Sequence, residues 1–296
     1  MSDSLLARIQ RGEVLLADGA IGSLLMARGL EKGAPPEGIN LSAPQVLEEI
    51  ARLYLEAGAD IVQTNTFGAS PLKLARYGLA AQTAEINAAA VRAVRRAVGG
   101  KAHVSASCGP SGRLLLPYGD IGEDEMRDSF LRQMAALADA GVDALCVETM
   151  TDLREARLAV EAARRAAPGI PVMATMTFEA TPRGFYTVMG ATIAAACRGL
   201  SDAGADLVGS NCGNGSALMA AIAGEFRKET RLPLVIQSNA GLPELRRGEV
   251  HYPETPEHMG RAARELRACG VAVIGGCCGT TPEHTRAMRR ALDEVA

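Results

Sequence analysis

The chain repeats one pattern of hydrophobic and polar positions eight times. In each copy, a short run of consecutive apolar residues leads into polar residues or glycine, and a longer stretch with helical spacing follows. Consecutive apolar positions are typical of strands that are buried on both faces of a parallel sheet. The predicted strands are residues 14–17, 60–64, 102–106, 143–147, 171–175, 206–209, 234–237 and 271–275.

Helices are predicted between and after these strands. Several begin at Asp, Thr, Ser or Pro, which suit a helix N-terminus, and a glycine such as Gly58 or Gly204 stands where a helix gives way to the next strand. The predicted helices are residues 44–57, 84–98, 123–140, 152–167, 192–203, 216–230, 256–268 and 282–295.

Eight alternating βα units predict an α/β protein with a (β/α)8 TIM barrel. A closed barrel is favoured over an open sheet because there are eight units and the 296 residues are close to the roughly 250 that such barrels use. No linker rich in Pro, Gly or Ser divides the chain, so a single domain over residues 1–296 is expected. Three irregular stretches, residues 29–42, 109–122 and 241–253, are expected on the face where barrel enzymes carry their sites.

Composition narrows the class of protein further. A net charge of −3 and 3% aromatic residues, with no Trp, argue against a nucleic-acid-binding protein. No apolar run approaches the roughly 20 residues that cross a bilayer, so no membrane segment is expected. The N-terminal residues lack the basic-then-apolar pattern of a signal peptide, which predicts a cytoplasmic protein.

The seven cysteines are the strongest chemical signal. An odd number without a secretion signal excludes complete disulfide pairing and favours metal ligation or reduced core thiols. Cys212 follows the sixth predicted strand, and Cys277 and Cys278 follow the eighth. These two strands flank the seventh in a closed barrel, so the three thiols can converge. Three thiolates without a fourth protein ligand nearby are typical of an open, catalytic zinc site.

Other roles for the cysteines remain open at this point. Cys277 and Cys278 could form a strained redox disulfide, although no CxxC pattern accompanies them. The other four cysteines are predicted to be small core residues: Cys108, Cys146, Cys197 and Cys269. This prediction is least clear for Cys108, because it also lies at the end of a strand. His284 falls early in the last predicted helix, and a structural role is expected for it.

Seven segments resemble the homocysteine S-methyltransferase family, and most of all the homocysteine-binding barrel of cobalamin-dependent methionine synthase. They occur in the family's order over essentially the whole chain, and the last, which contains Gly-Gly-Cys-Cys-Gly, is the most specific. The matching segments are residues 16–23, 63–69, 109–112, 147–150, 210–212, 239–241 and 275–284.

The resemblance implies a zinc ion held by the three cysteines at the ends of the sixth and eighth strands. It also implies a pocket for an amino acid, in which two carboxylates hold the substrate's ammonium group and one glycine contributes its backbone. The implied pocket residues are Asp18, Gly19, Glu148 and Asn239. From the residues alone, Glu148 could instead cap a helix, and Asp18 could belong to a turn.

The expected function is zinc-dependent transfer of a methyl group to the thiol of homocysteine, which gives methionine. A free thiol with a pKa near about 8.5 is mostly protonated at neutral pH, and zinc deprotonates a thiol that it binds. The thiolate then attacks an electrophilic methyl group.

Departures from the family pattern bear on the methyl donor. Methionine synthase carries further folate and cobalamin modules, whereas this sequence ends at Ala296, so the donor is expected to be free or carried by another protein. Betaine is disfavoured, because the betaine-using branch binds it with aromatic rings and here Gly68 follows Phe67. Two kinds of methyl donor remain: methylcobalamin on a corrinoid partner protein, and a sulfonium such as S-methylmethionine or S-adenosylmethionine.

The acceptor is also open to alternatives. The segments 213–215 and 183–190 differ from the expected pattern, and Tyr186 and Met189 either line the pocket or pack as ordinary loop residues. The competing functions are methyl transfer to a different thiol, a zinc-binding barrel that serves a corrinoid protein without independent activity, and a redox barrel.

Overall fold

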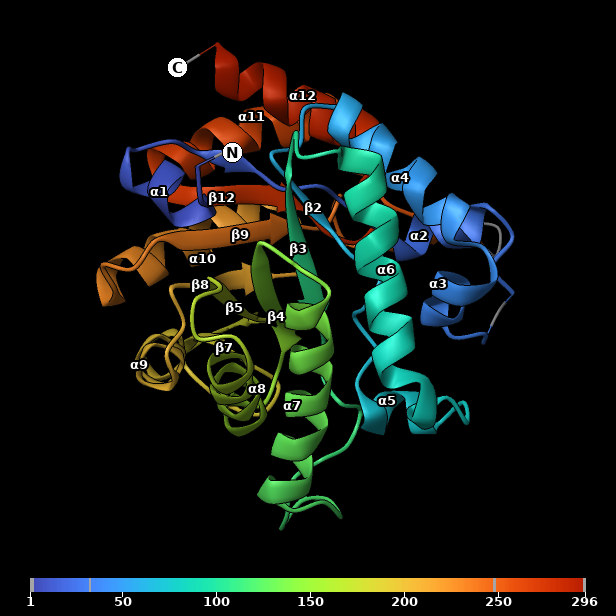
Figure 1. Ribbon diagram of the computed structural model, residues 1–296. Helices are drawn as coiled ribbons and strands as arrows, with labels where there is room; N and C mark the ends of the chain where they lie inside the picture. The colour runs from blue at the N-terminus through green and yellow to red at the C-terminus, as the bar shows by residue number, and fades with distance from the viewer. Residues whose placement is uncertain (1–2, 32, 247–248, 295–296) are drawn as a thin grey trace.

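Eight parallel strands form a nearly closed barrel in the computed structural model, which describes residues 3–31, 33–246 and 249–294. The strand order is β1-β12-β9-β8-β5-β4-β3-β2. A parallel bridge between Ala17 and Ile61 joins the two outer strands, and the Asp18 N–H donates to the Ile61 carbonyl at 3.0 Å. Helices surround the sheet in Figure 1, so the predicted (β/α)8 barrel is confirmed.

All eight predicted strands are present, each with one or both ends moved by one to three residues. The barrel strands are β1 (Leu15–Leu16), β2 (Ile61–Gln63), β3 (His103–Cys108), β4 (Ala144–Met150), β5 (Val172–Met176), β8 (Leu207–Asn211), β9 (Leu234–Ser238) and β12 (Val271–Gly276). Their side chains are almost entirely buried, which explains why each strand reads as a continuous apolar run.

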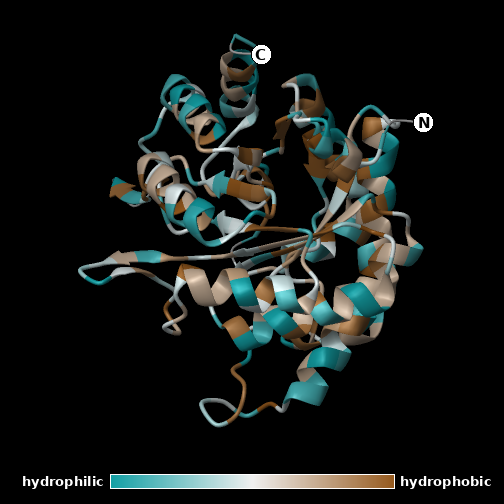
Figure 2. Ribbon diagram, turned by 90° about the vertical axis from the view of Figure 1, so that its left-hand side faces the viewer, coloured by the Kyte–Doolittle hydropathy of each residue, from teal (hydrophilic) through white to brown (hydrophobic). Residues whose placement is uncertain are grey.

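The eight predicted helices are also present. They are α4 (Pro44–Glu56), α6 (Thr83–Val98), α7 (Glu123–Asp139), α8 (Leu153–Ala166), α9 (Ile193–Ala203), α10 (Ser216–Glu229), α11 (Pro256–Ala268) and α12 (Pro282–Asp293). The predicted helix end at residue 295 lies outside the described residues. Figure 2 shows hydrophobic residues on the inner faces of the helices and hydrophilic residues outside, as amphipathic helices over a sheet require.

The irregular stretches are more ordered than the sequence indicates. Residues 29–42 contain η1 (Pro36–Gly38) and α3 (Ile39–Ser42), and residues 241–253 contain the hairpin of β10 (Glu244–Arg246) and β11 (Glu249–His251). Further unpredicted elements are α1 (Leu5–Gln10), α2 (Gly22–Ala27), α5 (Pro71–Ala75), η2 (Ala80–Gln82), β6 (Glu179–Thr181) and β7 (Gly184–Tyr186). These elements are short and several are exposed, so they lack a periodic apolar pattern.

The barrel interior is closed at one end by the N-terminal helix. Leu5 of α1 is buried and packs in one cluster with inward-facing residues of seven strands, among them Leu15, Cys146 and Val235. The other end of the barrel therefore carries the access to the interior. Among the described residues, no helix is long and apolar enough to cross a membrane.

Candidate active site

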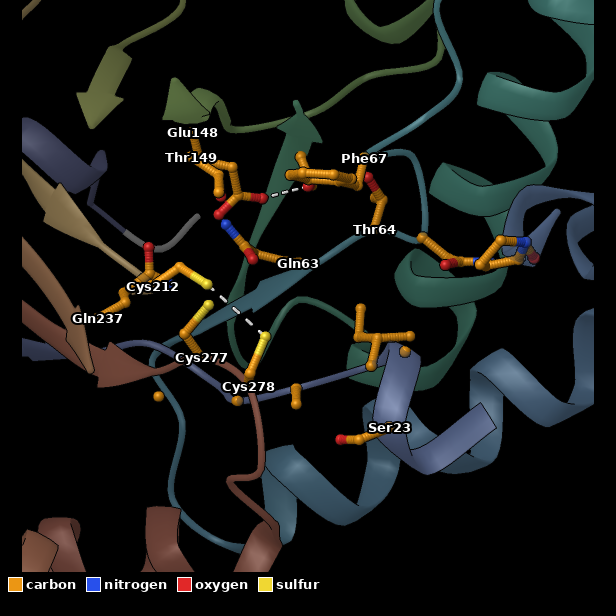
Figure 3. A pocket seen from close by; sticks show the side chains of 18 of the residues that line it. Ser23, Gln63, Thr64, Phe67, Glu148, Thr149, Cys212, Gln237, Cys277 and Cys278 are labelled. Carbon is orange, nitrogen blue, oxygen red and sulfur yellow. Dashed lines mark hydrogen bonds between the residues drawn. The ribbon is translucent and has the colours of Figure 1, made fainter. Parts of the chain in front are cut away.

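Three cysteine sulfurs lie together at the carboxyl ends of the barrel strands. Cys212 follows β8, and Cys277 and Cys278 follow β12, with β9 between these two strands. The three sulfur atoms all lie within 4.8 Å of one another, and the Sγ atoms of Cys212 and Cys278 are 3.7 Å apart. The structure thus brings together the three residues that the sequence identified, and their side chains point toward one another in Figure 3.

The spacing of these sulfurs fits a zinc ion. Two sulfurs that each lie about 2.3 Å from one tetrahedral zinc are about 3.8 Å apart. The distance between Cys212 Sγ and Cys278 Sγ is 3.7 Å. Soft thiolates also favour zinc over magnesium or calcium. Three sulfurs would leave one corner of the tetrahedron for another ligand.

The remaining cysteines do not join this cluster. Cys108, Cys146 and Cys197 are buried, as predicted for core residues. The same prediction for Cys269 is wrong in part, because this residue caps the C-terminus of α11 and is only half-buried. A position at the end of a surface helix leaves one side of its side chain in solvent.

The backbone at the site is strained. Cys212 and Thr149 both have a φ of 60°, and they are the only described residues other than glycine with a positive φ. Such a conformation costs about 1–3 kcal/mol and is found where the surroundings impose it. The Cys212 N–H donates to the Gln237 carbonyl at 3.1 Å, which fixes the turn after β8.

Asn211, for which the sequence predicted no role, connects the two strained residues. Its Oδ1 accepts hydrogen bonds from the Thr149 N–H and the Thr175 hydroxyl, both at 2.7 Å. Its Nδ2 donates to the Thr149 hydroxyl at 2.8 Å, and Cys277 Sγ lies 3.8 Å away. The side chain is 1% exposed. Because Asn211 directly precedes Cys212, this network holds the sulfur cluster to β4 and β5.

The three thiols share their protons unevenly. Hydrogen bonds with Cys277 and then Cys278 lower the pKa of Cys212, against the opposing effect of burial. The pKa values of Cys277 and Cys278 are raised in turn, first of all by their hydrogen bonds with Cys212. The cluster therefore stabilises a thiolate, and a cation between the sulfurs would take the place of the shared protons.

A cavity of about 320 Å³ opens beside the sulfurs. Glu148 and Gly19 line this cavity, as do Gln63, Thr64 and Phe67 (Figure 3). Glu148 is 5% exposed and accepts a hydrogen bond from the Ser107 hydroxyl, and burial raises its pKa to about 7. A Cβ at position 19 would lie 2.4 Å from the Thr280 hydroxyl, so only glycine fits there.

Asp18 and Asn239, the other two predicted pocket residues, do not line this cavity. The Asp18 side chain is fully buried and lines a separate void of about 10 Å³ beside Tyr54. The Asn239 side chain lies against Cys212, and its Oδ1 is buried without a hydrogen-bond partner in the described part of the chain. A hydrogen-bond acceptor without a partner is therefore carried by a side chain that contacts the sulfur cluster.

The buried Asp18 carboxyl is expected to make stability fall as the pH rises. Burial raises its pKa from 3.8 to about 8, so between these values the unfolded chain has released the proton that the native protein still holds. The free energy of unfolding should then decrease by about 1 kcal/mol per pH unit. Asp18→Asn should reduce the slope by that amount, because the amide does not titrate while its oxygen can still accept from the Gln63 N–H; the part that comes from Glu148, whose pKa is also raised, should stay. Urea unfolding of both proteins at pH 5 and pH 7 measures it, and equal slopes would contradict the expectation.

Packing answers two questions that the sequence left open: whether Tyr186 and Met189 line the pocket, and which role His284 has. Tyr186 and Met189 are not among the residues that line the cavity. The Arg183 guanidinium lies 5.7 Å from the Tyr186 ring centroid, and Met189 is exposed. The predicted structural role of His284 is confirmed. Its Nδ1 accepts from the Thr281 N–H at 3.1 Å in a capping box, and its Nε2 lies 3.0 Å from the Glu254 carbonyl.

Fold and site define a (β/α)8-barrel enzyme with a candidate metal centre at the carboxyl ends of its strands. The sequence profile of the homocysteine S-methyltransferase family matches residues 15–292. The chain therefore belongs to this family of methyltransferases.

Two relatives agree with this assignment. The chain is 35% identical over 301 residues to the methionine synthase of Mycobacterium tuberculosis, covering 95% of this chain and 25% of that protein. The methionine synthase of Mycobacterium leprae is also 35% identical, over 94% of this chain and 24% of that protein. The chain thus spans about a quarter of the length of these relatives.

A solved structure supports the fold. The metallated form of the homocysteine methyltransferase MmuM from Escherichia coli superposes with a TM-score of 0.82 at 24% identity. The match covers 97% of this chain and 99% of that one.

Proposed function

We propose that this protein transfers a methyl group to the thiol of homocysteine and so forms methionine, with zinc held by Cys212, Cys277 and Cys278. The observation that carries the proposal is the convergence of three sulfurs, within 4.8 Å of one another, at the wall of a cavity of about 320 Å³. The family profile and the metallated form of the E. coli homocysteine methyltransferase support it.

The chemistry divides between the metal and the chain. Bound zinc supplies a cation that ionises a substrate thiol at neutral pH without a general base. Asn211 and the backbone at Cys212 hold the sulfur ligands in place from β4, β5 and β9. Because these contacts exist before any substrate binds, little reorganisation is needed during the reaction.

Glu148 is the proposed anchor for the substrate's ammonium group. Its carboxylate is buried beside the cavity, and its hydrogen-bond donors, the Ser107 hydroxyl and the Gln63 side chain, are both uncharged. An ammonium group would supply the missing positive charge and lower the pKa of Glu148 again. Such a contact fixes the direction of the substrate sulfur, which is the positioning that speeds a two-reactant step.

The other three residues predicted to contact the substrate, Gly19, Asn239 and Asp18, remain part of the proposal, although the structure changes how each would act. Gly19 lines the cavity, and its backbone is the proposed contact for the substrate carboxylate, while its missing side chain leaves room for Thr280 and Tyr54. Asn239 offers its unpartnered Oδ1 beside Cys212. Asp18 lies away from the cavity wall, so its predicted contact with the ammonium group would require the side chain to turn.

A donor carried by a corrinoid partner protein is a second candidate beside a free sulfonium. Each exposed large hydrophobic side chain of the described residues lies between the end of a barrel strand and the next main helix, around the mouth of the barrel. Exposed apolar groups gathered in this way mark interaction surfaces. They are Met26, Phe67, Tyr77, Leu114, Leu116, Tyr118, Val188, Met189, Leu242, Leu245 and Val250.

A donor screen on zinc-loaded protein tests the proposed function. We expect methionine from homocysteine with at least one of S-methylmethionine, S-adenosylmethionine and methylcobalamin. Activity should disappear with a strong chelator and return with zinc, which also separates a metal site from a redox disulfide. Bound zinc without methionine from any donor would favour a barrel that serves another protein.

A further inference from the structure

Glu37 places a second buried carboxylate in the cavity that holds the sulfurs. It belongs to η1 in the loop after β1, lines the cavity, and is 5% exposed. Its Oε1 accepts a hydrogen bond from the Gly68 N–H at 2.6 Å. The carboxylate also contacts its own backbone N–H. Within the described ranges, no Lys, Arg or His nitrogen lies within 4.0 Å of it, and Lys73 acts on it only from a longer distance, so its charge is not paired.

Gly68 makes room for this carboxylate. A Cβ at position 68 would lie 3.3 Å from Glu37 Oε2 and 2.8 Å from Oε1, and the second distance is closer than real Cβ atoms come to a neighbour. The neighbouring Phe67 lines the same cavity and is 38% exposed. Its ring lies over Gly109, where a Cβ would come within 2.4 Å of it. An aromatic face and a buried carboxylate therefore border the same space.

We propose that Glu37 and Phe67 form a binding subsite for a positively charged group, and that this group is the sulfonium centre of the methyl donor. A carboxylate attracts such a cation by charge, and an aromatic face attracts it through its quadrupole. The inference rests on the proposed function, because it assigns the second reactant of that reaction.

The cavity has two buried carboxylates, Glu148 and Glu37, and the second of them indicates a second reactant with a positive charge. Homocysteine has one ammonium group, and Glu148 next to Thr149 and the sulfur cluster is placed to take it. Glu37 and Phe67 come instead from the loops after β1 and β2, neither of which carries a sulfur or Glu148. In Figure 3, Phe67 and Ser23 lie across the cavity from Cys212 and Cys277. In-line transfer requires the donor on the far side of the methyl group from the attacking sulfur.

The step is balanced without another reactant. The homocysteine sulfur forms a bond to the methyl carbon, and the bond between that carbon and the donor sulfonium breaks. The electron pair of the broken bond stays on the donor sulfur, which becomes a neutral thioether, and the thiol proton is released to solvent. Because the positive charge is lost in the reaction, Glu37 binds the donor more tightly than its product and favours product release.

The test is Glu37→Gln, which keeps an oxygen to accept from Gly68 but removes the charge. Because the donor sulfur keeps much of its positive charge in the transition state, the contact acts in both states, so we expect KM for S-methylmethionine to rise about 10-fold with kcat little changed. KM for homocysteine should not change. The Kd of S-methylmethionine on metal-free protein, measured by calorimetry, should weaken by a similar factor, which gives a readout that does not depend on turnover.

Two comparison variants sharpen the result. Glu155→Gln changes another carboxylate that is 5% exposed and accepts from the Ser111 N–H at 2.7 Å, but that does not line the cavity, and it should leave both reactants unaffected. Glu148→Gln should raise KM for homocysteine instead of that for the donor.

Three outcomes would overturn the assignment: an unchanged Kd for S-methylmethionine in the Glu37 variant, a changed KM for homocysteine alone, or wild-type protein that uses only methylcobalamin. If the wild-type protein uses only methylcobalamin, the proposed methyl transfer to homocysteine still stands, and only the sulfonium subsite is excluded. If no donor gives methionine, the proposed function fails, and the Kd on metal-free protein still decides whether the cation subsite exists.

Discussion

Replacing Cys212 by alanine is expected to remove the metal and the activity together. Two sulfurs from adjacent residues of one loop remain in that variant, and a structural or catalytic zinc site normally needs at least three protein ligands. Cys212 is also the only one of the three that comes from β8, so its loss disconnects the cluster from that strand. We expect a zinc content near zero and methionine formation reduced by about 1000-fold or more.

Zinc content by mass spectrometry and methionine formation under the same conditions measure both effects. Cys269→Ala is the matched control, because Cys269 is a free, half-buried cysteine at the end of α11 and outside the cluster. That variant should keep its zinc and its activity. A Cys212 variant with bound zinc and full activity would disprove the proposed site.

Replacing Asn211 by alanine is expected to damage stability and the site at once. The change removes three hydrogen bonds of a buried side chain, to the Thr149 N–H, the Thr149 hydroxyl and the Thr175 hydroxyl. Leaving a buried amide N–H without a partner costs about 1–3 kcal/mol, so we expect the free energy of unfolding to fall by about 3 kcal/mol. Because Thr149 and Cys212 would relax from a φ of 60°, zinc affinity and kcat should also decrease, by about 10- to 100-fold.

Asn87→Ala separates these two effects. Asn87 is fully buried in α6, and its Nδ2 donates to the carbonyls of Ala69 and Thr83 at 2.9 and 2.7 Å, away from the sulfurs. It should lose comparable stability in urea unfolding but keep normal zinc affinity and kcat at a temperature where it is folded. If Asn211→Ala behaves in the same way, Asn211 is a structural residue only.

The pattern along the chain was sufficient to predict the barrel. A strand such as β5 is buried on both faces, so its apolar run is visible without knowledge of its neighbours. Position along the repeat also brought Cys212 and Cys277 to the same end of the barrel, because parallel strands all end on one face. The cluster could therefore be predicted from residues that are 65 positions apart.

Side-chain direction at the strand ends was decided by the tertiary structure. Asp18 and Glu148 both follow or end strands, yet Glu148 lines the cavity and Asp18 faces a void beside Tyr54. The difference depends on one or two backbone angles and on the contacts of neighbouring strands, such as the Gln63 N–H that binds Asp18. No periodic pattern in the sequence records these.

The sequence by itself thus determined the order of strands and helices, the closed barrel, and the face on which the cysteines gather. This was possible because each βα unit of the barrel buries its strand and one face of its helix in the same way, so the apolar positions recur along the sequence. Only the tertiary structure decided that Asn211 holds two strained residues and that Glu37 occupies the space left by Gly68. Both depend on contacts between distant segments, and a single side chain in such a contact leaves no pattern to find.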